Sequence, residues 1–311
     1  MRVVRPRVIL DCDPGLDDAV AIALALAHAE VLGITTVGGN VGIEHTTANA
    51  IAVCELLGRT DVPVHAGHDE PLRGPLVARA TAYHGPTGTG DVVFTPGRPA
   101  DSEDAIGFIV EAARAHADVW LIATGPLTNV AHALAAAPDL VDRLAGISWM
   151  GGSATHGNVT AAAEFNCFAD PEAAAAVFAA GHRELSMAGL DVTLTVTLDR
   201  LWIDDLAARL AGRPVAVLAD LLAYYERGTR ARTTLAGTPV HDALAVVRVT
   251  HPHLVAGTRR PVQVVTEGPT RGMTLVDRRP ARRPEPANAL VLEWADAAGL
   301  RELVADTLDA T

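Results

Sequence analysis

Hydrophobic and polar positions follow two periods along the first 190 residues, and the alternation predicts strands followed by helices. Short apolar runs at 8–10 and 31–37 are typical of buried strands, and the segment between them, 19–29, has the spacing of a helix. A chain that alternates in this way forms a parallel sheet covered by helices. The pattern continues with strands predicted near 62–64, 119–123, 146–150 and 184–187, and with helices predicted near 46–57, 102–115, after Gly125-Pro126 and at 171–180.

The last third of the chain has a different pattern. Beyond Asp199 it is predicted to be mainly helical to about Arg248, and strand-like runs at 262–265, 273–276 and 289–292 precede a final helix. There is no internal repeat and no long linker. We therefore predict one α/β domain over residues 1–311, with a mostly parallel open sheet, helices on both faces, a Rossmann-like core and a helical late segment.

Composition narrows the classes of function. The formal net charge is −12 and the pI is near 5.4, which disfavours nucleic acid or an anionic membrane as a partner. All 25 basic residues are Arg, so Schiff-base chemistry and a P-loop lysine are excluded. A small-molecule ligand fits this composition better.

Cysteine usage and hydropathy indicate a cytoplasmic protein. The three cysteines, Cys12, Cys54 and Cys167, lack the spacing of a zinc site or a disulfide framework. The apolar run after the basic N-terminus is too short for a signal peptide. The longest stretch without Asp, Glu or Arg, 119–138, is interrupted by Gly and Pro, so we expect no membrane span.

The most informative segment is an acidic block where the first strand meets the first helix. It places Asp11, Asp13, Asp17 and Asp18 within eight residues. Capping of the helix N-terminus would account for Asp17 or Asp18 but not for all four. Their mutual repulsion is unfavourable without a cation, and ligation by oxygen alone favours Ca²⁺ or Mg²⁺ over zinc.

This block, Asp-x-Asp-Pro-Gly-x-Asp-Asp, resembles the signature of the inosine–uridine-type nucleoside hydrolases. The resemblance implies a Ca²⁺-dependent hydrolase of nucleoside salvage that cuts the N-glycosidic bond of purine or pyrimidine ribonucleosides to ribose and free base. Four further matches follow in the family's order and extend the resemblance over most of the chain: Thr35–Asn40; Ala123–Asn129; Met150–Gly152 with Asn158 and Ala163–Asn166; and Pro239–Ala243.

The resemblance assigns roles to individual residues. It implies that Ca²⁺ is bound by Asp13, Asp18, Asp242 and the main-chain carbonyl of Thr124. It also implies that Asp13 is the catalytic base, which takes a proton from the attacking water. The implied substrate contacts are Asp17 and Asn166 for the 2′- and 3′-hydroxyls, Asn158 and Glu164 for the 5′-hydroxyl, and Asn40 and Met150 for the shape of the ribose site.

Three of these residues also have structural explanations when each is taken alone. Asn40 follows two glycines and could be a turn residue, Asn166 could cap the helix predicted at 171–180, and Met150 could belong to the core. Their joint order in the family pattern favours the substrate site.

On the side of the departing base, His241 is the candidate acid because it directly precedes Asp242. The resemblance implies His at this position in the inosine–uridine-preferring branch and Trp in a purine-specific branch. His84 resembles a His-Gly loop beside the family's pocket. That loop departs from the family pattern, however, because Thr87 and Thr89 follow His84 where the family usually has Asp and then Leu or Met.

The predicted helix at 221–232 corresponds to one that commonly supplies aromatic residues to the base site. Tyr225, next to Tyr224, is the candidate contact here, but Thr229 and Thr233 follow it. The sequence therefore leaves the preference between purine and pyrimidine bases open.

Two other classes of function share part of this pattern. A haloacid-dehalogenase-like phosphatase also begins with Asp-x-Asp after a strand, but it requires Thr or Val where Gly15 stands and a later Lys. A non-catalytic, calcium-stabilised sugar-binding protein would not need Asp13 and His241. We expect a small ribonucleoside as the ligand, and a homo-oligomer, with a tetramer favoured over a dimer.

Overall fold

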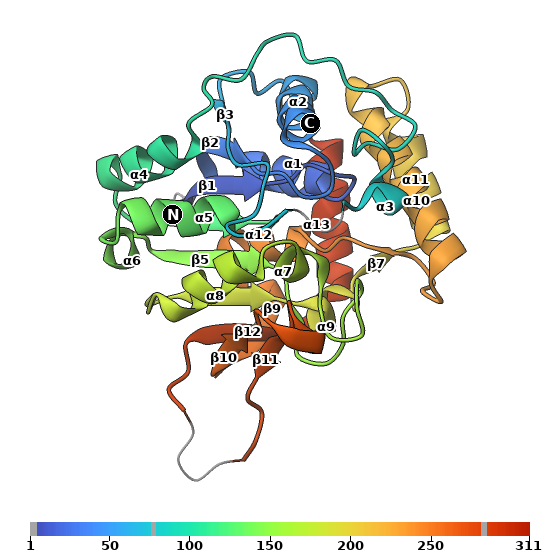
Figure 1. Cartoon of the computed structure of the whole chain (residues 1–311). Helices are drawn as coiled ribbons and strands as arrows, with labels where there is room; N and C mark the ends of the chain where they lie inside the picture. The colour runs from blue at the N-terminus through green and yellow to red at the C-terminus, as the bar shows by residue number, and fades with distance from the viewer. Residues whose placement is uncertain (1–4, 76–78, 281–284) are drawn as a thin grey trace.

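A twisted eight-stranded sheet organises the molecule (Figure 1). The computed structural model describes residues 5–75, 79–280 and 285–311. All neighbouring strands pair in parallel except the last pair, in which one edge strand runs antiparallel. In sheet order the strands are β3 (Val64–Ala66), β2 (Glu30–Thr36), β1 (Arg7–Cys12), β4 (Val119–Ala123), β5 (Gly146–Met150), β6 (Leu185–Ala188), β12 (Ala289–Ala295) and β9 (Val255–Arg260).

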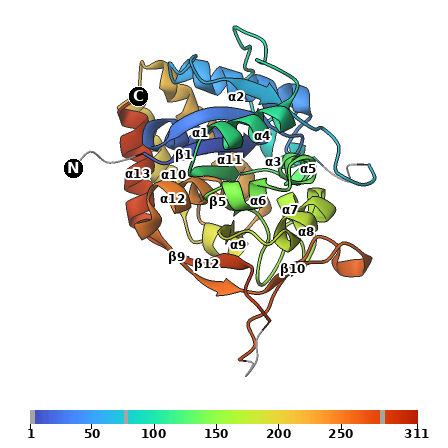
Figure 2. The same cartoon turned by 90° about the vertical axis from the view of Figure 1, so that its left-hand side faces the viewer.

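Helices cover both faces of this sheet, as Figures 1 and 2 show. Alternation along β1 explains why two faces must be covered, since Val8 and Leu10 enter one apolar core and Ile9 enters the other. One core includes residues of α1 (Asp18–His28), α2 (Ile43–Leu56), α12 (Ala243–Thr250) and α13 (Ala297–Asp309). The other includes residues of α4 (Ala105–Ala115), α5 (Thr128–Ala136), α6 (Leu140–Arg143) and α8 (Pro171–Ala179).

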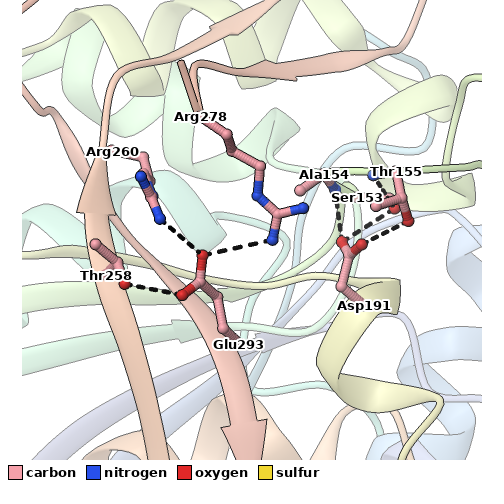
Figure 3. A network of polar contacts seen from close by, with 8 residues as sticks. All are labelled: Ser153, Ala154, Thr155, Asp191, Thr258, Arg260, Arg278 and Glu293. Carbon is pink, nitrogen blue, oxygen red and sulfur yellow. Dashed lines mark hydrogen bonds and ion pairs between the residues drawn. The ribbon is translucent and has the colours of Figure 1, made fainter. Parts of the chain in front are cut away.

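The remaining elements build the rim of the sheet's carboxyl edge and the lower end of the molecule. α10 (Arg200–Leu210) and α11 (Val217–Arg232) pack side by side. Glu293 joins β12 to β9 and to the segment after β11 (Thr274–Val276) by accepting from Thr258, Arg260 and Arg278 (Figure 3). These elements are α3 (Thr81–His84), α7 (Phe165–Ala169), α9 (Leu190–Thr193), β7 (Thr197–Leu198), α10 (Arg200–Leu210), α11 (Val217–Arg232), β8 (Thr238–Pro239), β10 (Val262–Val264) and β11 (Thr274–Val276), with 3-10 turns at Pro214–Ala216, Pro252–Leu254 and Gly268–Thr270.

The predicted fold class is confirmed, and most predicted elements lie within a few residues of their observed bounds. The strands at 119–123 and 146–150 have the predicted limits, whereas the helix expected after Gly125-Pro126 begins only at Thr128. The edge strand β9 was not predicted. Its sequence contains a glycine and its central residues are exposed, so it lacks the apolar alternation by which a strand is recognised.

Cys12, Cys54 and Cys167 are free thiols, as predicted, and all three are buried. In the part of the chain that the structure describes, no helix combines the length and the apolar character needed to cross a membrane.

Candidate active site

Carboxylates from distant parts of the sequence meet at the carboxyl edge of the sheet. Asp13 follows β1, Asp17 and Asp18 stand at the start of α1, and Asp242 directly precedes α12. Because α1 and α12 pack side by side, oxygens of Asp17, Asp18 and Asp242 lie within 4.8 Å of one another. All four side chains are buried.

This cluster strongly favours either protons or a cation. Burial and the neighbouring charge of Asp18 raise the pKa of Asp13 well above its usual range, and the same two causes raise the pKa of Asp17 to about 8. Burial, followed by the charge of Asp17, raises the pKa of Asp242. In addition, Asp13 Oδ1 is buried without a hydrogen-bond partner among the described residues. Buried carboxylates with a free oxygen fit a hard divalent cation such as Ca²⁺.

Short hydrogen bonds orient two of the three carboxylates that the resemblance assigned to the metal, Asp13 and Asp18. Asp13 Oδ2 accepts from the backbone N–H of Asn40 at 2.7 Å. Asp18 accepts from the N–H of Gly15 at 2.8 Å and from the hydroxyl of Thr124 at 2.9 Å. A Cβ at Gly39 would lie 2.0 Å from Asp13 Oδ2, so the backbone can approach this carboxylate only because residue 39 is glycine.

Capping does not explain Asp17. It occupies the N-cap position of α1, but its side chain accepts no capping hydrogen bond. Its carboxylate instead lines the cavity described below. The function of Asp17 must therefore be sought in that cavity.

Asp11, the first carboxylate of the block, has a different environment. It accepts from the Thr35 hydroxyl at 2.6 Å and from Asn129 Nδ2 at 2.8 Å, and burial raises its pKa to about 6. Asn129 also donates to the carbonyl of Thr36 at 2.9 Å. Asp11 thus ties together the ends of β1, β2 and the start of α5 instead of joining the cluster.

A cavity of about 350 Å³ opens beside the cluster. It brings together residues from both halves of the chain, whereas Asp13 and Asp18 are not among the residues that line it. The predicted site residues that line it are Asp17, Asn40, His84, Thr124, Met150, Asn158, Glu164, Asn166, Tyr225, His241 and Asp242.

Asn166 connects the metal ligands to the cavity. Its Nδ2 donates to the carbonyl of Thr124 at 2.9 Å and to that of Met150 at 3.0 Å. The alternative that Asn166 caps the following helix is wrong, because Asp170 caps α8 by accepting from the N–H of Ala173. Met150 is both core and cavity wall.

Glu164 and Asn158 hold the loop that precedes α7. The carboxylate of Glu164 accepts from the N–H groups of Gly152, Asn166 and Cys167, and it caps α7. Burial raises the pKa of Glu164 to about 7 in spite of these donors. Asn158 Oδ1 accepts from the N–H of Phe165 at 2.9 Å. Both side chains line the cavity, so capping leaves them available to a ligand.

Asn40 is more than a turn residue. Its side chain donates to the carbonyl of Asp13 at 3.1 Å while its backbone N–H holds the carboxylate of the same residue. The two bonds fasten the end of β1 to the loop after β2.

Two neutral histidines and an aromatic ring also line the cavity. His84 Nδ1 accepts from the N–H of Leu16 at 3.0 Å, and burial, then the nearby His241, lowers the pKa of His84 to about 3. Its ring lies 5.5 Å from that of Tyr225. Burial also lowers the pKa of His241 to about 4. At neutral pH both rings therefore act as uncharged hydrogen-bonding groups.

Several other residues that line the cavity were missed from the sequence. His156 lies in the glycine-rich loop two residues before Asn158, and that position was the available signal. Arg79 donates to the carbonyl of Val41 and to Asp69, but nothing in its local sequence indicates a cavity. The unpredicted lining residues are Arg79, Ala80, Ala82, Tyr83, His156, Val159, Phe165, Leu190, Leu194, Thr229, Thr233, Leu235 and Pro239.

Comparisons with known proteins identify the family of the chain. A family model described as "Inosine-uridine preferring nucleoside hydrolase" matches residues 8–302. Pyrimidine-specific ribonucleoside hydrolase RihA from Shewanella woodyi is 40% identical, with 99% of each chain covered, and RihA from Escherichia coli is 38% identical, with 97% of each covered. Among solved structures, a purine-preferring ribonucleoside hydrolase from Gardnerella vaginalis has a TM-score of 0.90 at 33% identity, with 98% of each chain covered.

Proposed function

Because the chain belongs to the inosine-uridine preferring nucleoside hydrolase family and is thus a ribonucleoside N-ribohydrolase, we propose that its cavity performs this hydrolysis with Ca²⁺ and prefers pyrimidine ribonucleosides. The observation that carries the proposal is the convergence of Asp17, Asp18 and Asp242, with the buried Asp13 near Asp18, beside a cavity that His241 also lines. Membership of this family excludes both alternatives, the phosphatase and the non-catalytic sugar-binding protein.

The metal proposal follows from the oxygens available. Asp13, Asp18, Asp242 and the carbonyl of Thr124 would hold the ion, and the unpartnered Asp13 Oδ1 supports a cation at this place. When bound, Ca²⁺ supplies positive charge that orients a water and makes it more acidic. The same charge relieves the repulsion among the buried carboxylates.

Each protein group then has one task. Asp13 accepts a proton from the water while the water oxygen attacks the ribose carbon that bears the base. Asp17 and Asn166 bind the 2′- and 3′-hydroxyls, and Asn158 and Glu164 bind the 5′-hydroxyl. Asn40 and Met150 complete the wall around the ribose. These contacts hold the sugar while it gains oxocarbenium character.

The base side must stabilise a leaving group that accumulates negative charge. His241 is half-buried and lines the cavity, and we assign it a hydrogen bond to the departing base. His84 and Tyr225 lie on the same wall and would contact the base. The identity to enzymes named pyrimidine-specific supports the proposed preference, because it extends over nearly the whole chain.

The test is hydrolysis of a panel of ribonucleosides by the purified protein, measured as released reducing sugar. We expect uridine and cytidine to be cleaved with higher kcat/KM than inosine and adenosine. Activity should disappear after exhaustive chelation and return with Ca²⁺. Full turnover by metal-free enzyme would contradict the metal proposal, and a preference for inosine would contradict the base proposal.

We also propose that the chain forms a homo-oligomer, a tetramer in preference to a dimer. The support is the family's resemblance alone. Light scattering on a size-exclusion column measures the mass directly, and a monomer of 32.4 kDa would refute the proposal.

A further inference from the structure

The ring of His241 is held from behind by a buried hydroxyl. Its Nδ1 lies 2.7 Å from Oγ1 of Thr193 in α9. Thr193 is fully buried, and unlike His241 it does not line the cavity. The Nδ1 edge of the ring therefore points away from the cavity, which leaves the Nε2 edge toward a ligand.

The direction of this hydrogen bond follows from the partners available. A threonine hydroxyl has one hydrogen to donate, and a neutral imidazole has one donor and one acceptor nitrogen. Among the described residues, the Thr193 hydroxyl has no acceptor other than His241 Nδ1. A buried O–H without an acceptor is unfavourable, so the hydroxyl donates to Nδ1 and the ring hydrogen resides on Nε2.

The short helix α9 is itself fixed to the cavity's loop. Figure 3 shows the Asp191 carboxylate accepting from the hydroxyls of Ser153 and Thr155, at 3.1 and 2.6 Å, and from the N–H of Ala154 at 2.5 Å. The N–H of Leu190 donates to the carbonyl of Gly152 at 3.0 Å. Thr193 thus stands on a fixed support and can hold the ring in one orientation.

We propose that Thr193 is a positioning residue for His241, and that its hydrogen bond to Nδ1 holds the ring in the tautomer whose Nε2–H faces the departing base. This proposal rests on the proposed function, and it explains why His241 can donate a hydrogen bond to the departing base. The hydrogen stays on Nε2, and no covalent bond forms or breaks at the ring.

The kinetic test compares Thr193→Val with Thr193→Ser. Valine keeps the shape and the β-branch but removes the hydroxyl, whereas serine keeps it. We expect Thr193→Val to lower kcat for uridine by roughly 10- to 100-fold with little change in KM, and Thr193→Ser to restore most of it. The rate on p-nitrophenyl riboside should change little, because its phenolate leaves without help.

Thr195 supplies a matched control. It stands two residues away and is exposed, and its hydroxyl donates to the carbonyl of Val192 at 2.6 Å. Thr195→Val therefore removes a hydroxyl of the same kind without touching His241. It should behave as the wild type on both substrates.

A second measurement does not depend on activity. Nitrogen-15 shifts of the His241 ring, assigned by comparison with His241→Gln, distinguish the two neutral tautomers. We expect the Nε2–H form in the wild type and a mixture of tautomers in Thr193→Val. An Nδ1–H ring in the wild type would overturn the inference, as would equal slowing of both substrates or wild-type rates in Thr193→Val. If the wild type cleaves no ribonucleoside, the proposed function fails, while the ring shifts still decide the role of Thr193.

Discussion

The two walls of the cavity differ in how they are built. The carboxylate wall comes from the ends of β1 and β4 and the starts of α1 and α12. Its carboxylates Asp13 and Asp18 accept hydrogen bonds from backbone N–H groups and from the hydroxyl of Thr124. The base wall comes from α3 and α11, where the rings of His84 and Tyr225 lie 5.5 Å apart, and from His241, which directly precedes Asp242 before α12. The side chains that act on the ribose, which every substrate shares, thus stand on the rigid sheet. The side chains that contact the base stand on elements that can change without disturbing the sheet.

The comparison predicts that the largest loss of activity follows a change in the carboxylate wall. Asp13→Asn should lower kcat by about 10⁴-fold or more on every substrate, because an amide neither accepts the proton nor balances a cation. Asp104→Asn is the matched control, since Asp104 caps the distant helix α4 and is exposed. Steady-state kinetics on uridine and p-nitrophenyl riboside measure both. A loss of only a few-fold would remove Asp13 from the role of base.

The next largest effect should come from the substrate's own hydroxyl. Deoxyuridine should be cleaved with kcat/KM lower than uridine by up to about 10⁴-fold, because its sugar leaves Asp17 and the metal without a partner. In Asp17→Asn the difference in kcat/KM between uridine and deoxyuridine should become smaller, since this variant has already lost the contact between Asp17 and the 2′-hydroxyl. Near-equal kcat/KM values for the two substrates in the wild type would mean that the ribose contacts are assigned wrongly.

The smallest expected effect is that of His241→Ala, and it distinguishes the role of the base wall from that of the carboxylate wall. His241→Ala should slow natural nucleosides by roughly 10²- to 10⁴-fold but leave most of the rate on p-nitrophenyl riboside. Asp13→Asn, by contrast, should slow both. Equal slowing of both substrates by His241→Ala would show that His241 supports Asp242 rather than the departing base. If neither substrate is slowed, the donor must be sought at His84, Tyr224 or Tyr225.

The sequence predicted the carboxylate wall far better than the base wall. Asp13, Asp17 and Asp18 are neighbours in the chain, so the crowding of charge was visible before any folding. Arg79 and His156 reach the base wall from separate loops, and no local pattern marks such positions. Glu164 was predicted as a substrate contact, but its capping of α7 became visible only with the backbone in place.

By itself, the sequence determined the order of strands and helices and the acidic block, because apolar periodicity and like charges act between residues close in the chain. Only the tertiary structure decided which distant groups meet. Packing of α1 on α12 brings Asp242 to Asp18 across more than 200 residues, and the placement of α9 brings the Thr193 hydroxyl to His241. Such contacts depend on how the whole chain packs, and no local period in the sequence records them.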